Sequence, residues 1–384
     1  MKNLVVIGLA LALNACASTQ KQVYKSQEDL TSTMGLFLDS LIMPDGFNIE
    51  VYARVNNARS MAMSPNGTLF VGNRKGGAVY AVQDRNKDHK ADTLYTIAEN
   101  LNQPNGVAFK DGVLYVAEID KLWRYDDIEA HFDDPVPTLV YDDFPKDSHH
   151  GPKFIAFGPD GKLYVPVGAP CNVCETKPDT YYASIIKMDT DGSHREVVAR
   201  GVRNTVGLAW HPITGELWFT DNGRDMLGDD IPPCELNRLT VEGEHFGFPY
   251  CHAGEILDPE FGIGKNCADY TAPVMKLNAH VAPLGLNFYT GDMFPASYKN
   301  KIIIPEHGSW NRSDDAGHSG HLLSIVTEEN GVGVAYETFV EGFLNKNSNT
   351  SWGRPVAVLV LDDGSVLISD DKSGTIYRMT YQTN

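Results

Sequence analysis

A short pattern that occurs six times is the feature that most restricts the fold of this 384-residue chain. Each copy has two apolar residues separated by one position, then a glycine-containing turn, then three or four residues typical of strands. Turns such as Pro-Asn-Gly between residues of high β propensity indicate hairpins. The copies are MAMSPNGTLFVG (61–72), VAFKDGVLYVAE (107–118), IAFGPDGKLYVPVG (155–168), LAWHPITGELWFTDNG (208–223), a longer fifth copy made of LGLNFYTGDM (284–293) and KIIIPEHG (301–308), and VLVLDDGSVLISDD (358–371).

The spacing of the copies predicts the architecture. A second hairpin often follows a copy, as in AVYAVQD, KLWRYDD, SIIKMDT and TIYRMTY. Four short strands that recur every ~40–50 residues are typical of propeller blades. We therefore predict an all-β fold, a six-bladed β-propeller over residues 41–384. A two-sheet sandwich would not explain six similar units. Because propeller loops converge on one site, we expect function in the long insertions at 221–280 and 305–321.

The N-terminus has the features of an export signal. Lys2 precedes an apolar stretch, LVVIGLALAL (4–13), which is too short to cross a bilayer as a helix. Leu-Asn-Ala-Cys then resembles a lipoprotein cleavage site, which predicts a signal peptide over residues 1–15 and lipidation of Cys16. The alternative is an ordinary cleaved signal with a chance cysteine. We predict a periplasm-facing outer-membrane lipoprotein, in which residues 16–40 form a flexible tether.

The charge balance narrows the classes of partner. The formal net charge is −18, and no basic cluster stands out. Nucleic acids and anionic membrane surfaces are bound through lysine and arginine footprints, so both are unexpected partners. A neutral small molecule or a metal cation suits this composition better.

Five cysteines follow Cys16, and an oxidising compartment favours disulfides among them. Cys171 and Cys174 are spaced for a short-loop bridge, and Cys251 with Cys267 would staple an insertion. Cys234 then remains unpaired. A zinc site is the competing interpretation of the Cys-x-x-Cys spacing, but no second such pair or His-x-x-x-His partner is present.

The segment 201–250 carries a family resemblance. It reads GVRNTVGLAWHPITGELWFTDNGRDMLGDDIPPCELNRLTVEGEHFGFPY: an Arg-Asn pair before a strand, a glycine turn, an acidic loop and a Gly-Phe-Pro-Tyr close. This order resembles the pyrroloquinoline quinone (PQQ)-dependent soluble sugar dehydrogenases, most closely their L-sorbosone and aldose dehydrogenase branch. The resemblance implies a propeller, PQQ and calcium as cofactors, and sugar oxidation by hydride transfer to the quinone.

PQQ is a flat quinone with three carboxylates, and guanidinium groups pair with carboxylates through two parallel hydrogen bonds. The resemblance implies that Arg203 and Asn204 contact PQQ, with Asn222 beside them. It also implies that Gly223 and Arg224 offer backbone carbonyls to a calcium ion, a ligand type that this ion accepts. The alternatives are a structural Arg-Asn pair and an ordinary turn.

The segment DSHHGPKFIAFGPDG (147–161) resembles the family's His-x-x-x-Arg/Lys motif, with His149 and Lys153 in those places. We predict His149 as the general base, because an imidazole can take a hydroxyl proton near neutral pH. His150 is the alternative register. Gly168 and Ala169 stand where the family has an aspartate that orients the histidine. We assign that orienting role to Asn172 instead.

Other family positions match less closely. SWGRPV (351–356) keeps one of two arginines, Arg354, and places Trp352 where the other stands, so Trp352 could stack on quinone or sugar. The family's lysine is absent, and His307 and Arg312 lie in the corresponding segment, where Arg312 could supply the charge. We also expect Gln103 to contact substrate, or to serve a blade turn.

A separate loop carries oxygen-bearing side chains at the spacing of a calcium site, although His89 stands where such loops have glycine. The alternative is a polar hairpin tip. The predicted ligands are Asp84, Asn86, Asp88 and Asp92.

Together these features predict a PQQ- and calcium-dependent oxidoreductase that oxidises an aldose or related sugar aldehyde at C1 and passes electrons to a quinone or cytochrome. Two alternatives stay open. One is a calcium-dependent lactone hydrolase, which would gather carboxylates in the central channel. The other is a non-catalytic binding propeller.

Overall fold

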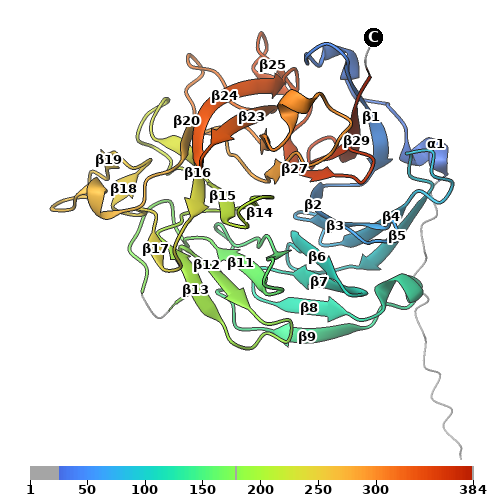
Figure 1. The fold of residues 1–384 in the computed structure, drawn as a ribbon, viewed down its shortest axis with the longest axis horizontal. Coiled ribbons are helices and arrows are strands. Elements are labelled where there is room, and N and C mark those ends of the chain that lie inside the picture. The colour runs from blue at the N-terminus through green and yellow to red at the C-terminus, as the bar shows by residue number, and fades with distance from the viewer. Residues whose placement is uncertain (1–25, 178–179, 383–384) are drawn as a thin grey trace, which may run out of the picture.

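Six sheets stand around a common axis in the computed structural model of the chain, which describes residues 26–177 and 180–382 (Figure 1). Each sheet contains four antiparallel strands in neighbour-to-neighbour order, and the third carries one additional parallel strand. This arrangement confirms the predicted six-bladed β-propeller.

The strands follow the repeat. Blade 1 contains β2 (Ala58–Met63), β3 (Leu69–Asn73), β4 (Val79–Gln83) and β5 (Thr93–Ala98). Blade 2 contains β6 (Gly106–Lys110), β7 (Val113–Ala117), β8 (Leu122–Tyr125) and β9 (Pro137–Tyr141). Blade 3 contains β10 (Ala156–Phe157), β11 (Leu163–Val167), β12 (Ser184–Met188), β13 (Glu196–Arg200) and the parallel strand β17 (Glu244–His245).

The second half of the ring repeats the arrangement. Blade 4 contains β14 (Leu208–Trp210), β15 (Leu217–Asp221), β16 (Pro233–Leu239) and β20 (Met275–Ala279). Blade 5 contains β21 (Asn287–Phe288), β22 (Ile302–Glu306), β23 (Leu322–Glu329) and β24 (Val332–Val340). Blade 6 contains β27 (Pro355–Val360), β28 (Val366–Asp370), β29 (Thr375–Tyr381) and β1 (Phe47–Arg54).

Short elements decorate the ring. Two small hairpins pair β18 (Cys251–His252) with β19 (Ile256–Leu257), and β25 (Leu344–Asn345) with β26 (Thr350–Ser351). The helices are α1 (Gln27–Leu30) and the single-turn 3₁₀ segments η1 (Leu38–Ser40), η2 (Ile128–Ala130), η3 (Cys267–Asp269) and η4 (Ala296–Tyr298). No helix within the described ranges has the length and apolar character needed to cross a bilayer.

Each repeated pattern forms the first two strands of a blade. Its glycine occupies the turn between them, as at Gly67 (φ 87°) and Gly364 (φ 84°), where the left-handed backbone disfavours residues with a Cβ. The first strands line the central channel, and a cavity of about 280 Å³ there touches a residue of each: Met61, Val107, Phe157, Leu208, Asn287 and Ala357. Mostly apolar side chains line this part of the channel.

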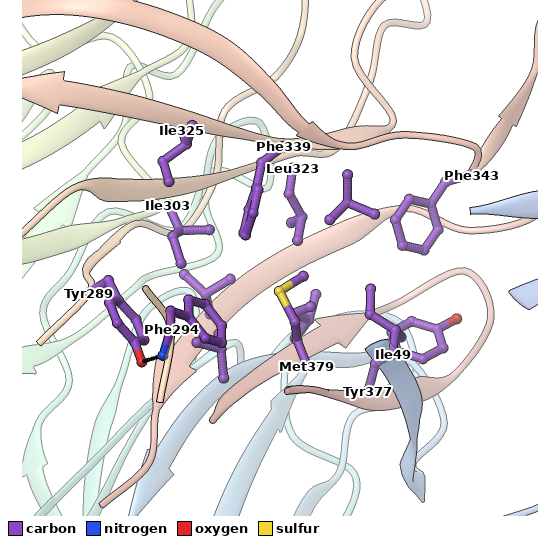
Figure 2. Close-up of a cluster of buried hydrophobic side chains, with 14 residues drawn as sticks. Ile49, Tyr289, Phe294, Ile303, Leu323, Ile325, Phe339, Phe343, Tyr377 and Met379 are labelled. Carbon is purple, nitrogen blue, oxygen red and sulfur yellow. Dashed lines mark hydrogen bonds between the residues drawn. The ribbon is translucent and has the colours of Figure 1, made fainter. Parts of the chain in front are cut away.

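The ring closes through the N-terminal strand. β1 is the outer strand of blade 6 and pairs antiparallel with β29, from Phe47 opposite Tyr381 to Arg54 opposite Thr375. An apolar cluster then joins blades 5 and 6, with Ile303 and Leu323 of one blade facing Tyr377 and Met379 of the other (Figure 2). All four side chains are at most 1% exposed. Burial of this kind holds adjacent blades together.

The segment before β1 differs from the prediction of a flexible tether over residues 16–40. Its described part contains α1, whose Leu30 is fully buried against Tyr52 and Val55 of blade 6. Ile42 forms a β-bridge with Glu341. The segment from residue 26 onward therefore packs on the propeller, because its apolar residues find partners there. Residues 1–25, including the predicted signal peptide and Cys16, lie outside the described residues.

Both predicted disulfides are confirmed. Cys171 pairs with Cys174, and Cys251 pairs with Cys267 across the insertion that contains β18 and η3. Cys234 is a free, buried cysteine. The disulfide at Cys171 excludes the zinc interpretation of that spacing.

A candidate active site at one end of the channel

Loops at one end of the channel enclose a cavity of about 500 Å³. Its walls come from the starts of innermost strands and from the loops that follow second strands. The lining side chains are mostly cationic or polar: Arg59, Arg74, Ser148, His149, His150, Arg203, Asn204, Asn222, Asp225, His280, His307, Trp310, Asn311 and Arg354. Six of the predicted site residues therefore meet in one place: His149, Arg203, Asn204, Asn222, Gly223 and Arg354.

Three arginines and one carboxylate form one wall of the cavity. Asp371 accepts a hydrogen bond from Arg59 Nη1 at 2.6 Å and one from His307 Nε2 at 2.8 Å. Arg354 donates to the backbone carbonyls of His307 and Gly308. Within the described chain, neither Arg354 nor Arg74 has a carboxylate within salt-bridge distance. This wall carries more positive than negative charge.

The electrostatics of this wall follow from crowding and burial. Burial, and after it the neighbouring Arg59 charge, lowers the pKa of Arg74. Burial lowers the pKa of His307 to about 4 against the opposing charge of Asp371, so the imidazole is neutral near pH 7. Like charges held this close are stabilised when an anion binds between them.

Arg203 lies on another wall, with a side chain only 4% exposed. Its guanidinium donates to the backbone carbonyls of Asn172 and Asn222 and to the side chains of Asn172 and Asp225. Its backbone amide and that of Asn204 donate to the buried carboxyl of Asp221. The Arg-Asn pair is therefore fixed in position by the end of β15.

The two histidines before β10 both reach the cavity, with ring centroids 4.1 Å apart. His150 Nδ1 lies 2.9 Å from the Ala169 carbonyl oxygen, and burial lowers the pKa of His150 to about 2. His149 is less buried. Its pKa is lowered by burial and by Arg203, while Asp225 and the Cys171 carbonyl act in the opposite direction. His149 is thus the more basic of the pair.

Lys153, the other half of that motif, points away from the cavity. Its side chain is 1% exposed and Nζ donates to the Gly151 carbonyl at 2.6 Å. Burial lowers its pKa to about 7. Asn172, our substitute for the family aspartate, forms its hydrogen bonds with Arg203 and Asp225, and none between its side chain and His149 is found among the described residues.

The predicted calcium carbonyls lie at the edge of the cavity. Gly223 lines it, while the Arg224 side chain turns away and pairs with the buried Asp258. Within the described residues, no backbone amide donates to the carbonyl of Gly223 or Arg224. Neither carbonyl is therefore occupied by a backbone hydrogen bond from the described chain, and of the two residues Gly223 lines the cavity. Cys234 is buried beside Gly223, and burial raises the pKa of its thiol to about 11.

Three predicted contacts lie outside the cavity. Trp352 packs on Phe343 and donates its indole N–H to the Gly342 carbonyl, so it belongs to the blade 6 core and to a different surface hollow. The placement corrects its prediction as a stacking residue. Arg312 is bound to Asp230 and to the carbonyls of Asp229 and Gly317, so it braces loops. Gln103 accepts from Arg74 and reaches the cavity only through it.

Two carboxylates of the loop at 84–92 accept hydrogen bonds from the loop's own backbone amides. Asp84 accepts hydrogen bonds from the amides of Asp88 and His89, and Asp92 accepts from those of Arg85 and Asn86. Over 26–177 and 180–382, no group of three or more His, Cys, Asp or Glu side chains is arranged to hold a metal. The structure therefore does not form the predicted calcium cluster and favours the hairpin-tip alternative.

Several site residues were missed from the sequence. Arg59 and Arg74 come from blade 1, and Asp371 follows β28 more than 290 residues later. No local spacing could connect them, because the ring closure alone brings the first and last blades together. Trp310 also lies on the cavity rim, with 66% of its surface exposed.

Comparison with known proteins agrees with this geometry. The profile of the Glucose / Sorbosone dehydrogenase family matches residues 136–306, and a profile described as TrAA12-like matches residues 262–382. An uncharacterized protein of Borreliella burgdorferi is 35% identical over 380 residues, which cover 92% of this chain and 93% of the relative.

Solved structures share the fold at low identity. The calcium structure of the Trichoderma reesei enzyme of carbohydrate-active family AA12 superposes with a TM-score of 0.76 at 17% identity, covering 89% of this chain and 97% of that one. The holo form of the PQQ domain of pyranose dehydrogenase from Coprinopsis cinerea gives 0.72 at 17% identity, covering 88% and 97%. Repeat, fold, site and family profile point the same way, and the chain belongs to the glucose/sorbosone dehydrogenase family.

Proposed function

We propose that this protein is a PQQ- and calcium-dependent dehydrogenase that oxidises an aldose or a related sugar aldehyde at C1. The observation that carries the proposal is the cationic cavity in an otherwise acidic chain. Arg59, Arg74 and Arg354 crowd one wall around a single ionised carboxylate, while the chain has a formal net charge of −18. A small, flat ligand with several carboxylates is the chemical complement of such a wall.

The donor set fits PQQ. Arg354 Nη1 forms no hydrogen bond to a described residue, and Arg74 uses only Nε, on Gln103. Both guanidinium groups therefore keep donors for ligand carboxylates. Asn204 and Asn222 offer further polar contacts on the opposite wall, whereas Arg203, whose donors are engaged by the protein, contributes mainly its charge.

A calcium ion fits the carbonyl oxygens of Gly223 and Arg224, because calcium accepts backbone carbonyls as ligands. Bound in this cavity, PQQ would supply a hydride acceptor for the substrate carbon, and calcium held by these carbonyls would supply positive charge beside it. His149 removes the hydroxyl proton of the substrate, since its imidazole is neutral near pH 7 and faces the cavity.

The alternatives fit the observed side chains less well. A calcium-dependent lactone hydrolase would place carboxylates around a channel metal, whereas mainly apolar side chains line the channel and arginines line its mouth. A binding propeller does not account for a histidine beside a cationic cavity. We further propose export to the periplasm, lipid anchoring at Cys16 and electron transfer to a quinone or cytochrome, on the basis of the sequence motifs.

The test is reconstitution. Protein treated with chelator is supplied with PQQ and Ca²⁺, and reduction of a dye is followed across a panel of aldoses. We expect aldose-dependent reduction that needs both additions. Dye reduction that is indifferent to PQQ, or that is absent for every sugar although PQQ binds, would contradict the proposed reaction.

A further inference from the structure

The short loop closed by the Cys171–Cys174 disulfide lies next to residues that line the cavity. Asn172 makes four hydrogen bonds between this loop and those residues. Asn172 accepts from Arg203 at two atoms: its backbone oxygen from Nε at 2.8 Å, and its side-chain oxygen from Nη2 at 2.9 Å. The same side-chain oxygen accepts from the Asp225 amide at 2.8 Å, and the side-chain amide donates to the Asp225 carbonyl at 3.1 Å.

These four hydrogen bonds tie the disulfide loop to the two segments that flank the β14–β15 pair. Arg203 precedes β14, and Asp225 lies in the insertion after β15. Asp225 in turn binds Arg203 Nη2 and accepts from Asn311, which reaches across from blade 5. Asn172 thus fixes both ends of the ion pair on this wall, and the wall cannot relax without breaking contacts to the loop.

The disulfide fixes where Asn172 lies. One of the two hydrogen bonds between Asn172 and Arg203 uses the main-chain oxygen of Asn172. The disulfide between Cys171 and Cys174 restrains this main chain on both sides. Cys171 and Val173 also pack on the buried Ala169 and Phe248. The Cys171 carbonyl additionally faces His149 as a hydrogen-bond acceptor.

We propose that Asn172 is a positioning residue of this site, and that the Cys171–Cys174 disulfide loop is the rigid part that holds Arg203 and His149 in their working positions. The loop acts on Arg203 through Asn172 and on His149 through the Cys171 carbonyl. Neither Asn172 nor the two cysteines line the cavity, so their effect passes through Arg203.

The readout is the chemical accessibility of Arg203 in cofactor-free protein, measured by phenylglyoxal modification and peptide mass spectrometry. Asn172→Ala removes three of the four bonds, and we expect Arg203 to be modified about tenfold faster, the effect of losing roughly one charged hydrogen bond. Asn172→Asp keeps the acceptor for Arg203 and should leave it protected. The double variant C171S/C174S should expose Arg203, whereas C251S/C267S, which removes the other disulfide, should not.

Arg203 that stays protected in both Asn172→Ala and C171S/C174S would overturn the proposal, as would equal exposure in C251S/C267S. If Asn172→Ala does not fold, C171S/C174S against C251S/C267S decides. The inference rests on the proposed function only for its second readout, in which the PQQ dissociation constant should rise about tenfold with Asn172→Ala. Exposed Arg203 together with no PQQ binding by wild type would uphold the positioning role and reject the cofactor.

Discussion

Replacing Asp371 with asparagine tests the charge balance of the arginine wall. The Asp371 side chain is 10% exposed and that of Arg59 only 4%. Burial disfavours the ionised carboxyl, but His307 and Arg59 outweigh burial and hold the pKa of Asp371 well below its usual range. Asparagine keeps the shape of the side chain and removes the charge that compensates Arg59.

The expected cost is large, because a buried guanidinium is left beside two others. Breaking one partner of a buried ion pair costs about 3–5 kcal/mol, and the open cavity, which admits water, places this case near 3 kcal/mol. An anion in the cavity would replace the lost charge. Saturating PQQ with Ca²⁺ should therefore stabilise the Asp371→Asn variant more than wild type.

Urea unfolding at pH 7, with and without PQQ and Ca²⁺, measures both effects. The control is Asp292→Asn, which removes a carboxylate 2.6 Å from Lys299 that is 95% exposed and should change stability little. Since the folded pKa of Asp371 lies below its unfolded value of 3.8, its contribution is present above that pH and is lost as the pH falls. The gap between wild type and variant should close in acid.

An equal loss of stability with and without PQQ would refute the reasoning, since it would make Asp371 a purely structural partner. A loss comparable to that of Asp292→Asn would refute it as well, because the wall would then not need its carboxylate.

Three further outcomes follow. His149→Ala should retain PQQ affinity but lose about 100-fold or more in dye reduction, the usual contribution of a general base; weakened PQQ binding would instead assign it to the cofactor pocket. Burial raises the pKa of Glu306 to about 7, so the wild-type protein is most stable below pH 4.5 and loses stability up to about pH 7, where the carboxyl ionises in the unfolded chain but stays protonated in the fold. Glu306→Gln cannot ionise, so its stability relative to wild type should rise between pH 4.5 and about 7. A flat difference in urea unfolding across that range would contradict this expectation. Cys16→Ser should abolish incorporation of labelled fatty acid in cells, and retained label would exclude this cysteine as the anchor.

The fold could be predicted because its signal is local and repeated. Each glycine turn between β-prone residues specifies one hairpin, and six such hairpins along one chain leave few architectures. The ends of the chain were harder to predict. The polar composition of 16–40 suggested a tether, but Leu30 finds a buried place on blade 6, which depends on tertiary contacts that composition does not show.

The site residues also divide into those that a local motif predicts and those that depend on tertiary contacts. His149, Arg203 and Gly223 were found because each lies in a continuous motif. Arg59 and Asp371 were missed because the pair forms only when the ring closes. Trp352 and Arg312 were misplaced for a related reason: a motif position predicts where the backbone lies, whereas neighbouring core side chains and loop carbonyls decide where a long side chain turns.

The most direct measurement is an equilibrium titration of PQQ into chelator-treated protein, followed by absorbance with and without Ca²⁺. The account predicts saturable binding of one PQQ per chain that tightens with Ca²⁺, weakens at least about tenfold in Arg354→Ala, and is unchanged in Lys346→Ala, which removes a distant surface cation. Absence of saturable binding by wild type, or equal binding by both variants, would contradict the assignment of the arginine cavity as a PQQ site.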